Sequence, residues 1–135
     1  MNIGCHIIIE CQGRHGHLSE VELEALLVSA AEAGGASVLQ AHFHPFGAGK
    51  GITGVVLLAE SHITVHTWPE HDYAAFDIFM CGECKPMLAA DVITTAYIDT
   101  VTSVQSIDRG LPIDTGNVFA NLSSSRAQSN SFSAG

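Results

Sequence analysis

The chain has 135 residues, 47% of them hydrophobic and 14% charged, which suits one compact domain with a substantial core. Its 14 Asp and Glu against 5 Lys and Arg give a formal charge of −9, which argues against a nucleic-acid-binding protein, because such proteins carry basic surfaces. No apolar run is long enough for a membrane span, and the N-terminus lacks the pattern of a signal peptide. We therefore expect a cytoplasmic protein with no membrane partner, whose four cysteines are reduced thiols.

The first half of the chain predicts a strand, a helix and two more strands. Residues 4–10 are rich in β-branched side chains and predict a strand. Ser19 and Glu22 form a capping-box pattern ahead of leucines and alanines at helical spacing, and Gly34 and Gly35 end that helix. Residues 37–46 and 52–59 predict strands on either side of a glycine-rich turn.

The second half predicts two strands, a helix and a last strand. Residues 61–68 alternate between apolar and polar, residues 73–80 form another strand, Pro86 suits the start of a helix over 88–97, and residues 100–107 close the pattern. The order β-α-β-β then β-β-α-β predicts an α+β fold, a two-layer α/β sandwich with helices on one face of a mainly antiparallel sheet. Residues 1–112 would form this domain, and 113–135, rich in Ser and Asn, a flexible tail.

The densest group of polar side chains lies at residues 60–70, directly after an apolar strand. Ser61 and His66 are separated by an odd number of positions, so a regular strand puts them on opposite faces, and contact between them needs a bend or break. A Ser-His hydrolase is one interpretation, although the Gly-x-Ser-x-Gly elbow is missing. A zinc site is another, since histidines are plentiful and Cys81 and Cys84 form a CxxC, but a lone CxxC is a weak signal.

The same segment resembles the signature of the small prokaryotic S-adenosylmethionine decarboxylase proenzymes. Residues 60–70 read Glu-Ser-His-Ile-Thr-Val-His-Thr-Trp-Pro-Glu, and three further runs resemble family elements in the same order: Phe-His-Pro-Phe at 43–46, Gly-Ile-Thr-Gly-Val-Val at 51–56 and Tyr-Ala-Ala-Phe-Asp-Ile-Phe-Met-Cys-Gly at 73–82. The resemblance covers about residues 4–109, and several motifs in order are more specific than any one of them.

The resemblance implies self-cleavage between Glu60 and Ser61. The hydroxyl of Ser61 attacks the carbonyl of Glu60 to give an ester, and elimination leaves a covalent pyruvoyl group on the new N-terminus, so the chain divides into a β chain, 1–60, and an α chain, 61–135. Such a reaction needs a donor for the oxyanion and a base for the α-proton. His66 matches the family histidine that removes this proton, and Thr53 stands where a family serine assists processing.

The resemblance also implies the reaction and its residues. The pyruvoyl group condenses with the amine of S-adenosylmethionine and accepts the electrons released with carbon dioxide. Cys81 matches the cysteine that returns a proton to the substrate, Phe46 an aromatic that stacks on adenine, and Glu70 a carboxylate that binds ribose hydroxyls. No metal is expected. The product would supply aminopropyl groups for polyamine synthesis, and the family implies a homodimer with active sites near its interface.

Several departures from the family pattern keep alternatives open. Thr53 adds a methyl group to the serine it replaces, and Pro45 replaces an arginine. The same pyruvoyl machinery could decarboxylate ornithine or arginine, and a homologue that does not process itself could regulate a partner enzyme. Cys84 has no strong family match and is interpreted as structural. Trp68 is expected in the core, and His6 or Glu10 beside the substrate pocket.

Overall fold

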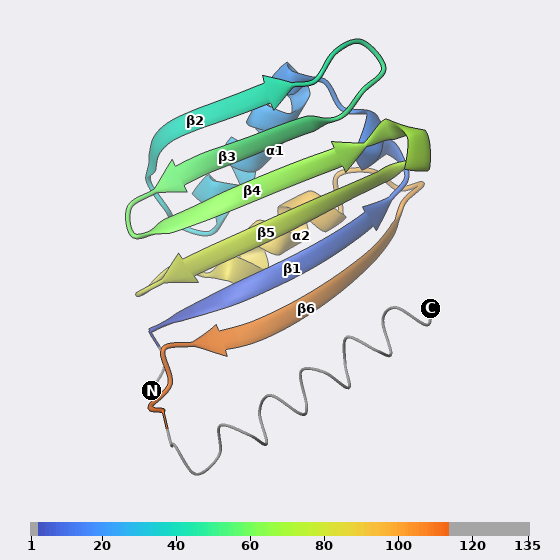
Figure 1. Ribbon diagram of the computed structural model, residues 1–135. Helices are drawn as coiled ribbons and strands as arrows, with labels where there is room; N and C mark the ends of the chain where they lie inside the picture. The colour runs from blue at the N-terminus through green and yellow to red at the C-terminus, as the bar shows by residue number, and fades with distance from the viewer. Residues whose placement is uncertain (1–2, 114–135) are drawn as a thin grey trace.

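The computed structural model describes residues 3–113, and these form one antiparallel sheet backed by two helices (Figure 1). The six strands lie in the order β2-β3-β4-β5-β1-β6, and all neighbouring strands are antiparallel. Along the chain the elements are β1 (Gly4–Gln12), η1 (Arg14–His17), α1 (Glu20–Ala33), β2 (Val38–Pro45), β3 (Ile52–Leu58), β4 (Ser61–Trp68), η2 (Pro69–His71), β5 (Tyr73–Cys81), α2 (Pro86–Thr94) and β6 (Val101–Arg109).

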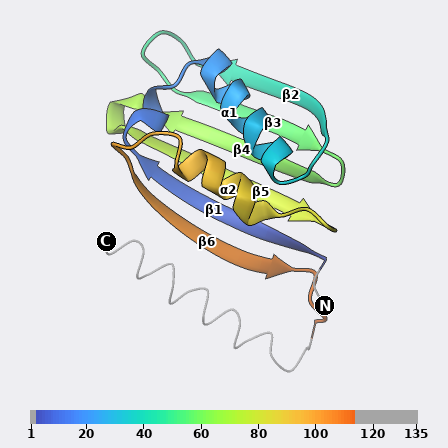
Figure 2. The ribbon, with the colours of Figure 1, turned by 180° about the vertical axis from the view of Figure 1, so that it is seen from behind.

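This architecture confirms the predicted α+β sandwich, including its two halves of β-α-β-β and β-β-α-β order. Seen from behind, α1 and α2 lie side by side across the same face of the sheet (Figure 2). The other face carries no helix among the described residues. We call this second side of the sheet the open face. The tail predicted at 113–135 lies, apart from its first residue, outside the described residues.

The helix α1 begins where the capping-box pattern predicted. The Ser19 hydroxyl accepts a hydrogen bond from the backbone N–H of Glu22, and the Glu22 carboxylate accepts one from the backbone N–H of Ser19. These two bonds satisfy N–H groups that have no partner within the helix, and they lower the pKa of the Glu22 carboxyl. The cap therefore fixes where the helix starts on the sheet.

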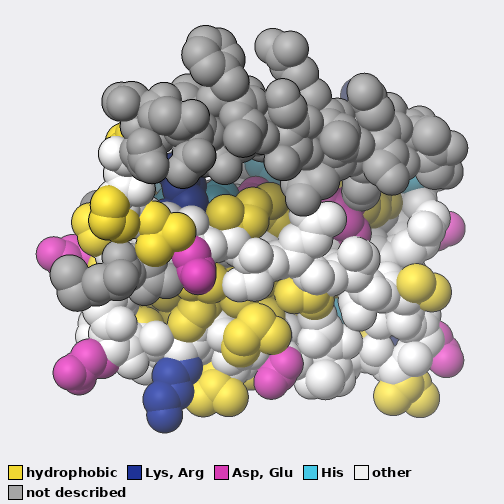
Figure 3. Space-filling view, turned by 90° about the horizontal axis from the view of Figure 1, so that it is seen from below, with side chains coloured by type: hydrophobic (Ala, Val, Ile, Leu, Met, Phe, Trp, Pro, Cys, Tyr) yellow, Lys and Arg dark blue, Asp and Glu magenta, His cyan; other side chains and the backbone are white. Residues whose placement is uncertain are grey.

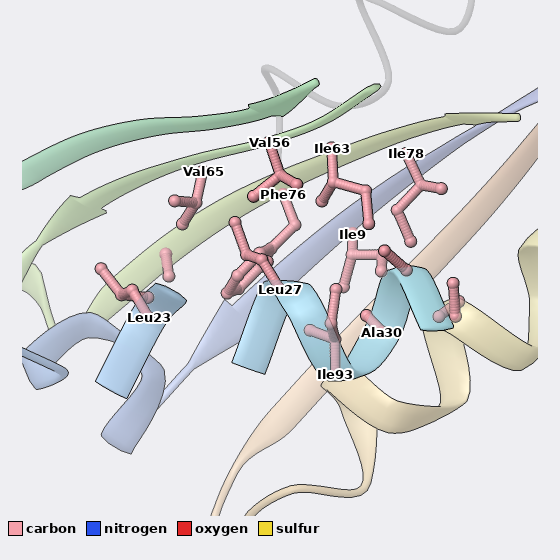
Figure 4. Close-up of a cluster of buried hydrophobic side chains, with 14 of the residues drawn as sticks. Ile9, Leu23, Leu27, Ala30, Val56, Ile63, Val65, Phe76, Ile78 and Ile93 are labelled. Carbon is pink, nitrogen blue, oxygen red and sulfur yellow. The ribbon is translucent and has the colours of Figure 1, made fainter. Parts of the chain in front are cut away.

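The core lies between the helices and the sheet (Figure 4). Alternate side chains of each central strand point to the helices, so in β4 it is Ile63 and Val65 that are fully buried. They pack toward Leu23 and Leu27 of α1, while Ile93 of α2 closes the same cluster. The alternation that predicted β4 as a strand thus also predicts which of its side chains form the core.

Two local details differ from the sequence prediction. The loop after β1 contains the short helix η1, whose His15 is fully buried. The helix predicted over 88–97 ends at Thr94, because the chain then turns so that the Tyr97 ring packs edge-on against His15, at 5.1 Å between centroids. The His15 ring nitrogen Nε2 lies 2.7 Å from the carbonyl oxygen of Ile93 and ties the end of α2 to η1.

The sheet has two edge strands, β2 and β6. β6 carries exposed apolar side chains, including Val101, Val104 and Ile107. Seen from below, the molecule shows apolar side chains interspersed with acidic and other polar groups (Figure 3). No helix within residues 3–113 has the length and apolar character needed to cross a membrane.

Candidate active site

The side chains singled out in the sequence lie in two groups, one at each end of β4. Residues of β4 with even numbers point to the open face and those with odd numbers to the helices. The first group surrounds His66, near the end of the strand, and the second surrounds Ser61, at its beginning.

The first group lines a hollow of about 310 Å³, a volume at the lower end of the range for ligand pockets. Its walls come from the loop after β2, from β3, from the end of β4 and from η2: Phe46, Gly51, Thr53, His66, Thr67, Trp68 and Glu70. The sequence analysis had selected Phe46, Thr53, His66 and Glu70, so the fold brings together four candidates from three separate motifs.

The polar centre of the hollow is the pair Thr53 and His66. They are cross-strand partners on β3 and β4, and the Thr53 hydroxyl lies 3.0 Å from His66 Nδ1. This contact fixes the orientation of the imidazole. A threonine therefore retains the hydrogen bond that a serine could make at this position, and its additional methyl group is accommodated on the strand.

The aromatic walls of the hollow are open to solvent. Phe46 is 57% exposed and Trp68 41% exposed, which is unusual for side chains of this size and apolarity. The expectation that Trp68 belongs to the core is wrong, because its even-numbered position places it on the open face, where it stacks on Tyr73 at 5.4 Å between ring centroids. Two exposed aromatic rings beside one hollow suit a flat ligand ring.

The sequence analysis missed two other residues of the hollow, Gly51 and Thr67. A Cβ atom on Gly51 would lie 1.9 Å from the Thr67 carbonyl oxygen, so only glycine permits this approach of the two strands. The buried Thr67 hydroxyl accepts a hydrogen bond of 2.9 Å from the backbone N–H of Ile52. Glycine directly before a predicted strand was the available signal for such a close contact.

The second group surrounds the hairpin between β3 and β4. The Cys81 thiol donates to the Glu60 carbonyl oxygen at 3.1 Å, and its Sγ lies 3.7 Å from the Ser61 hydroxyl oxygen. Glu60 has a φ of 61°, in the left-handed region, which costs a residue with a side chain roughly 1–2 kcal/mol. The peptide bond between Glu60 and Ser61 is therefore held in a tight, strained turn, with a thiol on its carbonyl oxygen.

The structure does not bring Ser61 and His66 together within one chain. β4 is a continuous strand, without the bend or break that their contact would need. Five residues of strand separate their Cα atoms by about 16 Å. The Ser61 side chain is also on the helix side and only 9% exposed, whereas His66 is on the open face. One chain thus contains both expected groups, Ser61 and His66, but they are too far apart for contact.

The two residues of β1 expected near the pocket lie elsewhere. His6 Nε2 is 3.3 Å from a carboxylate oxygen of Asp77, and Glu10 accepts a hydrogen bond from the Tyr73 hydroxyl. Burial and this carboxylate together raise the pKa of Tyr73. Both residues sit on the open face, but neither lines the hollow.

Between residues 3 and 113, no three His, Cys, Asp or Glu side chains are grouped as a metal ion would require. In particular, the Cys84 sulfur contacts the Gly35 carbonyl oxygen at 3.8 Å, and all four cysteines are free thiols. The zinc interpretation of the CxxC therefore gains no support from the geometry.

Comparison with known proteins shows the family of the chain. Residues 5–110 match the family model described as S-adenosylmethionine decarboxylase, and the chain therefore belongs to that family. A protein of Thermodesulfovibrio yellowstonii named S-adenosylmethionine decarboxylase proenzyme is 41% identical over 112 residues, 81% of this chain and 82% of the relative. One of Methanococcus maripaludis with the same name is 41% identical over 119 residues, 86% and 96% of the two chains.

A solved structure gives the same result for the fold. The crystal structure of the adenosylmethionine decarboxylase from Aquifex aeolicus superposes with a TM-score of 0.70 and 32% identity, over 84% of this chain and 95% of the other. Both the fold and the family predicted from the sequence are thus confirmed.

Proposed function

We propose that this chain cleaves itself between Glu60 and Ser61 and then decarboxylates S-adenosylmethionine, using a pyruvoyl group made from Ser61. The observation that carries the proposal is the strained turn at Glu60, with the Cys81 thiol on the carbonyl oxygen of the bond to be cut. Attack by the Ser61 hydroxyl on this carbonyl would place negative charge on the oxygen that already accepts a hydrogen bond from Cys81. Relief of the left-handed conformation favours cleavage in the same direction.

The residues around Ser61 fit the pyruvoyl group. Once formed, that group supplies a ketone for the substrate amine and an electron sink for decarboxylation. Cleavage frees the start of β4, next to Cys81. The Cys81 thiol would then hold and deliver the proton that the substrate α-carbon needs after carbon dioxide leaves.

The hollow supports S-adenosylmethionine as the substrate. Phe46 and Trp68 offer exposed aromatic faces for the adenine ring, and the Glu70 carboxylate offers two acceptor oxygens for ribose hydroxyls. The net charge of −9 also favours a cationic sulfonium compound over an anion. The product would enter polyamine synthesis. The cytoplasmic location expected from the sequence stays a prediction.

We further propose that two copies pair through their open faces. Ser61 and Cys81 at one end of the sheet need the base and the substrate hollow found near its other end, about 16 Å away along β4. A two-fold axis across the open face would bring the Glu60–Ser61 turn of one copy, where the adjacent Cys81 is on the open face, to the His66 hollow of the other, and it would do so twice. Each active site would then take Ser61 and Cys81 from one copy, and Thr53, His66, Phe46 and Glu70 from its partner.

The two alternatives weighed in the sequence analysis gain no support. The family model and the relatives described above all carry adenosylmethionine in their names, and none carries ornithine or arginine. A non-processing regulator would have no need for a thiol on the Glu60 carbonyl beside an intact Ser61.

Intact-mass analysis of the purified chain beside a Ser61→Ala variant tests the cleavage. We expect two fragments that divide after Glu60, the second with a pyruvoyl N-terminus, and a single chain in the variant. Release of labelled carbon dioxide from S-adenosylmethionine tests the activity. A chain that remains whole under all conditions would refute the proposal.

Co-expression of Ser61→Ala with His66→Ala tests the shared site. Alone, Ser61→Ala should not cleave, and His66→Ala should cleave only very slowly. In a mixed dimer, the His66→Ala chain keeps its own Ser61 and receives His66 from the partner, so we expect cleaved fragments that carry the His66→Ala mass. If co-expression gives no cleaved fragments, each chain uses only its own His66, and the two-copy site is wrong.

A further inference from the structure

The turn after β5 contains a second cysteine that the proposed reaction does not use. Cys81 ends β5 and lies on the Glu60 carbonyl, whereas Cys84 follows three residues later, before α2. Each thiol is partly exposed and free. A peroxide in solution could therefore reach either cysteine.

The backbone of this turn brings the two cysteines close together. The N–H of Cys84 donates to the carbonyl oxygen of Cys81 at 3.4 Å, the hydrogen bond of a four-residue turn. The Cα atoms at the ends of such a turn are less than about 7 Å apart, and disulfides usually span about 4.4–6.8 Å. Gly82 has a φ of 66° with no other atom near its Cβ position, so the turn is not held apart by packing at this residue.

The other two cysteines are unsuited to pairing with Cys81. Cys11 is fully buried, and burial raises the pKa of its thiol to about 12, so it stays protonated. Cys5 is adjacent to the strand partner of Cys81, but its Sγ lies 3.1 Å from the Ser106 hydroxyl on β6. Alternation along β1 and β5 places these two side chains on opposite faces of the sheet.

We propose that Cys81 and Cys84 form a reversible disulfide when the protein meets a hydroperoxide, and that this bond switches the enzyme off. One thiolate attacks one peroxide oxygen and becomes a sulfenic acid, while the other oxygen leaves after protonation, as water from hydrogen peroxide or as an alcohol from an organic hydroperoxide. The second thiolate then attacks this sulfur and expels water. The two thiols lose two electrons to the peroxide, and a dithiol can return them.

The effect on activity rests on the proposed role of Cys81. With its sulfur bonded to Cys84, Cys81 has no proton to donate to the substrate and no thiol for the Glu60 carbonyl. Formation of the disulfide requires the turn and release of the two sulfurs from the Glu60 and Gly35 carbonyl oxygens, but it requires no catalytic activity. The chemical test and the activity test can therefore fail separately.

The test treats the full-length, cleaved protein with hydrogen peroxide, blocks remaining thiols with iodoacetamide and maps the peptides by mass. We expect the peptide that holds Cys81 and Cys84 to lack both alkyl groups and the mass of two hydrogens, while the Cys11 peptide of the unfolded sample is alkylated. Decarboxylation should fall by about 100-fold, the usual contribution of a general acid, and dithiothreitol should restore it. The Ser61→Ala protein should form the same bond, since the mass readout needs no activity.

Two variants complete the test. Cys84→Ser should keep the basal activity, but prolonged peroxide should carry its Cys81 to the sulfinic acid, which dithiothreitol does not reverse. Cys5→Ser, the matched control, should behave like the parent. The proposal is overturned if both cysteines of the pair remain fully alkylated while decarboxylation is lost. It is also overturned if dithiothreitol restores decarboxylation in Cys84→Ser as completely as in the parent.

Discussion

The two faces of the sheet are built from the same strands but carry opposite kinds of side chain. On the helix side, Ile63, Val65 and Ile78 are fully buried. On the open face, their neighbours His66 and Asp77 are only partly buried and make polar contacts. An antiparallel sheet permits this division because one face can pack on a core while the other stays accessible. Buried apolar residues and partly buried polar residues thus alternate along each strand, and mutations on the two faces should have different effects.

The largest effect should come from His66 on the open face. We expect His66→Ala to slow self-cleavage by about 100-fold or more, because it removes the proposed base for the α-proton of the ester. Its midpoint of thermal unfolding should change little, since the side chain is not part of the core. Time-resolved mass analysis after synthesis measures the rate.

His42→Ala is the matched control for this variant. His42 is an exposed histidine on the edge strand β2, one strand beyond β3, and it does not line the hollow. Its cleavage rate should equal that of the parent chain. Equal slowing of self-cleavage in both variants would show that the effect is not specific to His66, and would contradict its role as the base.

A smaller effect, and one on stability, should come from the helix side. We expect Ile78→Ala to lower the free energy of unfolding by about 2–5 kcal/mol, because it leaves a cavity in the core. Urea unfolding measures this change. Thr64→Ala on the open face removes one hydrogen bond to Asp77 and should cost about 1 kcal/mol. Similar losses in both variants would contradict the division between the faces.

The smallest effect should be the pH dependence contributed by His15 within the helix layer. Burial lowers the pKa of His15 from its ordinary value of 6.5. Below that pH the unfolded chain binds a proton at His15 that the folded chain resists. The contribution of the buried His15 to the free energy of unfolding is therefore complete above pH 6.5 and is lost as pH falls toward the lowered pKa. Through this titration the free energy of unfolding should change by no more than about 1.4 kcal/mol per pH unit.

Urea unfolding of the parent and of His15→Asn between pH 7.5 and pH 5 measures this slope, at about half-unit steps. The variant should be less stable at high pH, and the difference between the two proteins should shrink as the pH falls. A constant difference would mean that His15 does not titrate in this range.

Much of the fold could be predicted from the sequence because the signals were local. Alternation at 61–68 and the Ser19 capping box each fixed an element within a residue or two. The end of α2 could not be predicted in this way. Tyr97 leaves the helix in order to pack on His15, a contact between residues 82 positions apart in the chain.

The candidate site was predictable in its parts but not in its assembly. The motifs identified Thr53 and His66, and the register of β3 and β4 makes them partners. Strand alternation had also indicated that Ser61 and His66 lie on opposite faces. The position of Trp68 was missed although the alternation at 61–68 puts it on the same face as His66, because a large aromatic residue is usually taken for core.

The strand order has one more consequence for a chain that is cut in two. Residues 1–60 contribute β1, β2 and β3, and residues 61–135 contribute β4, β5 and β6. Yet β1 lies between β5 and β6, and β4 and β5 lie between β3 and β1, so each fragment is inserted among the strands of the other. Three strand interfaces, β3 with β4, β5 with β1 and β1 with β6, join the two pieces. The fragments are interwoven, and they should part only when the whole domain unfolds.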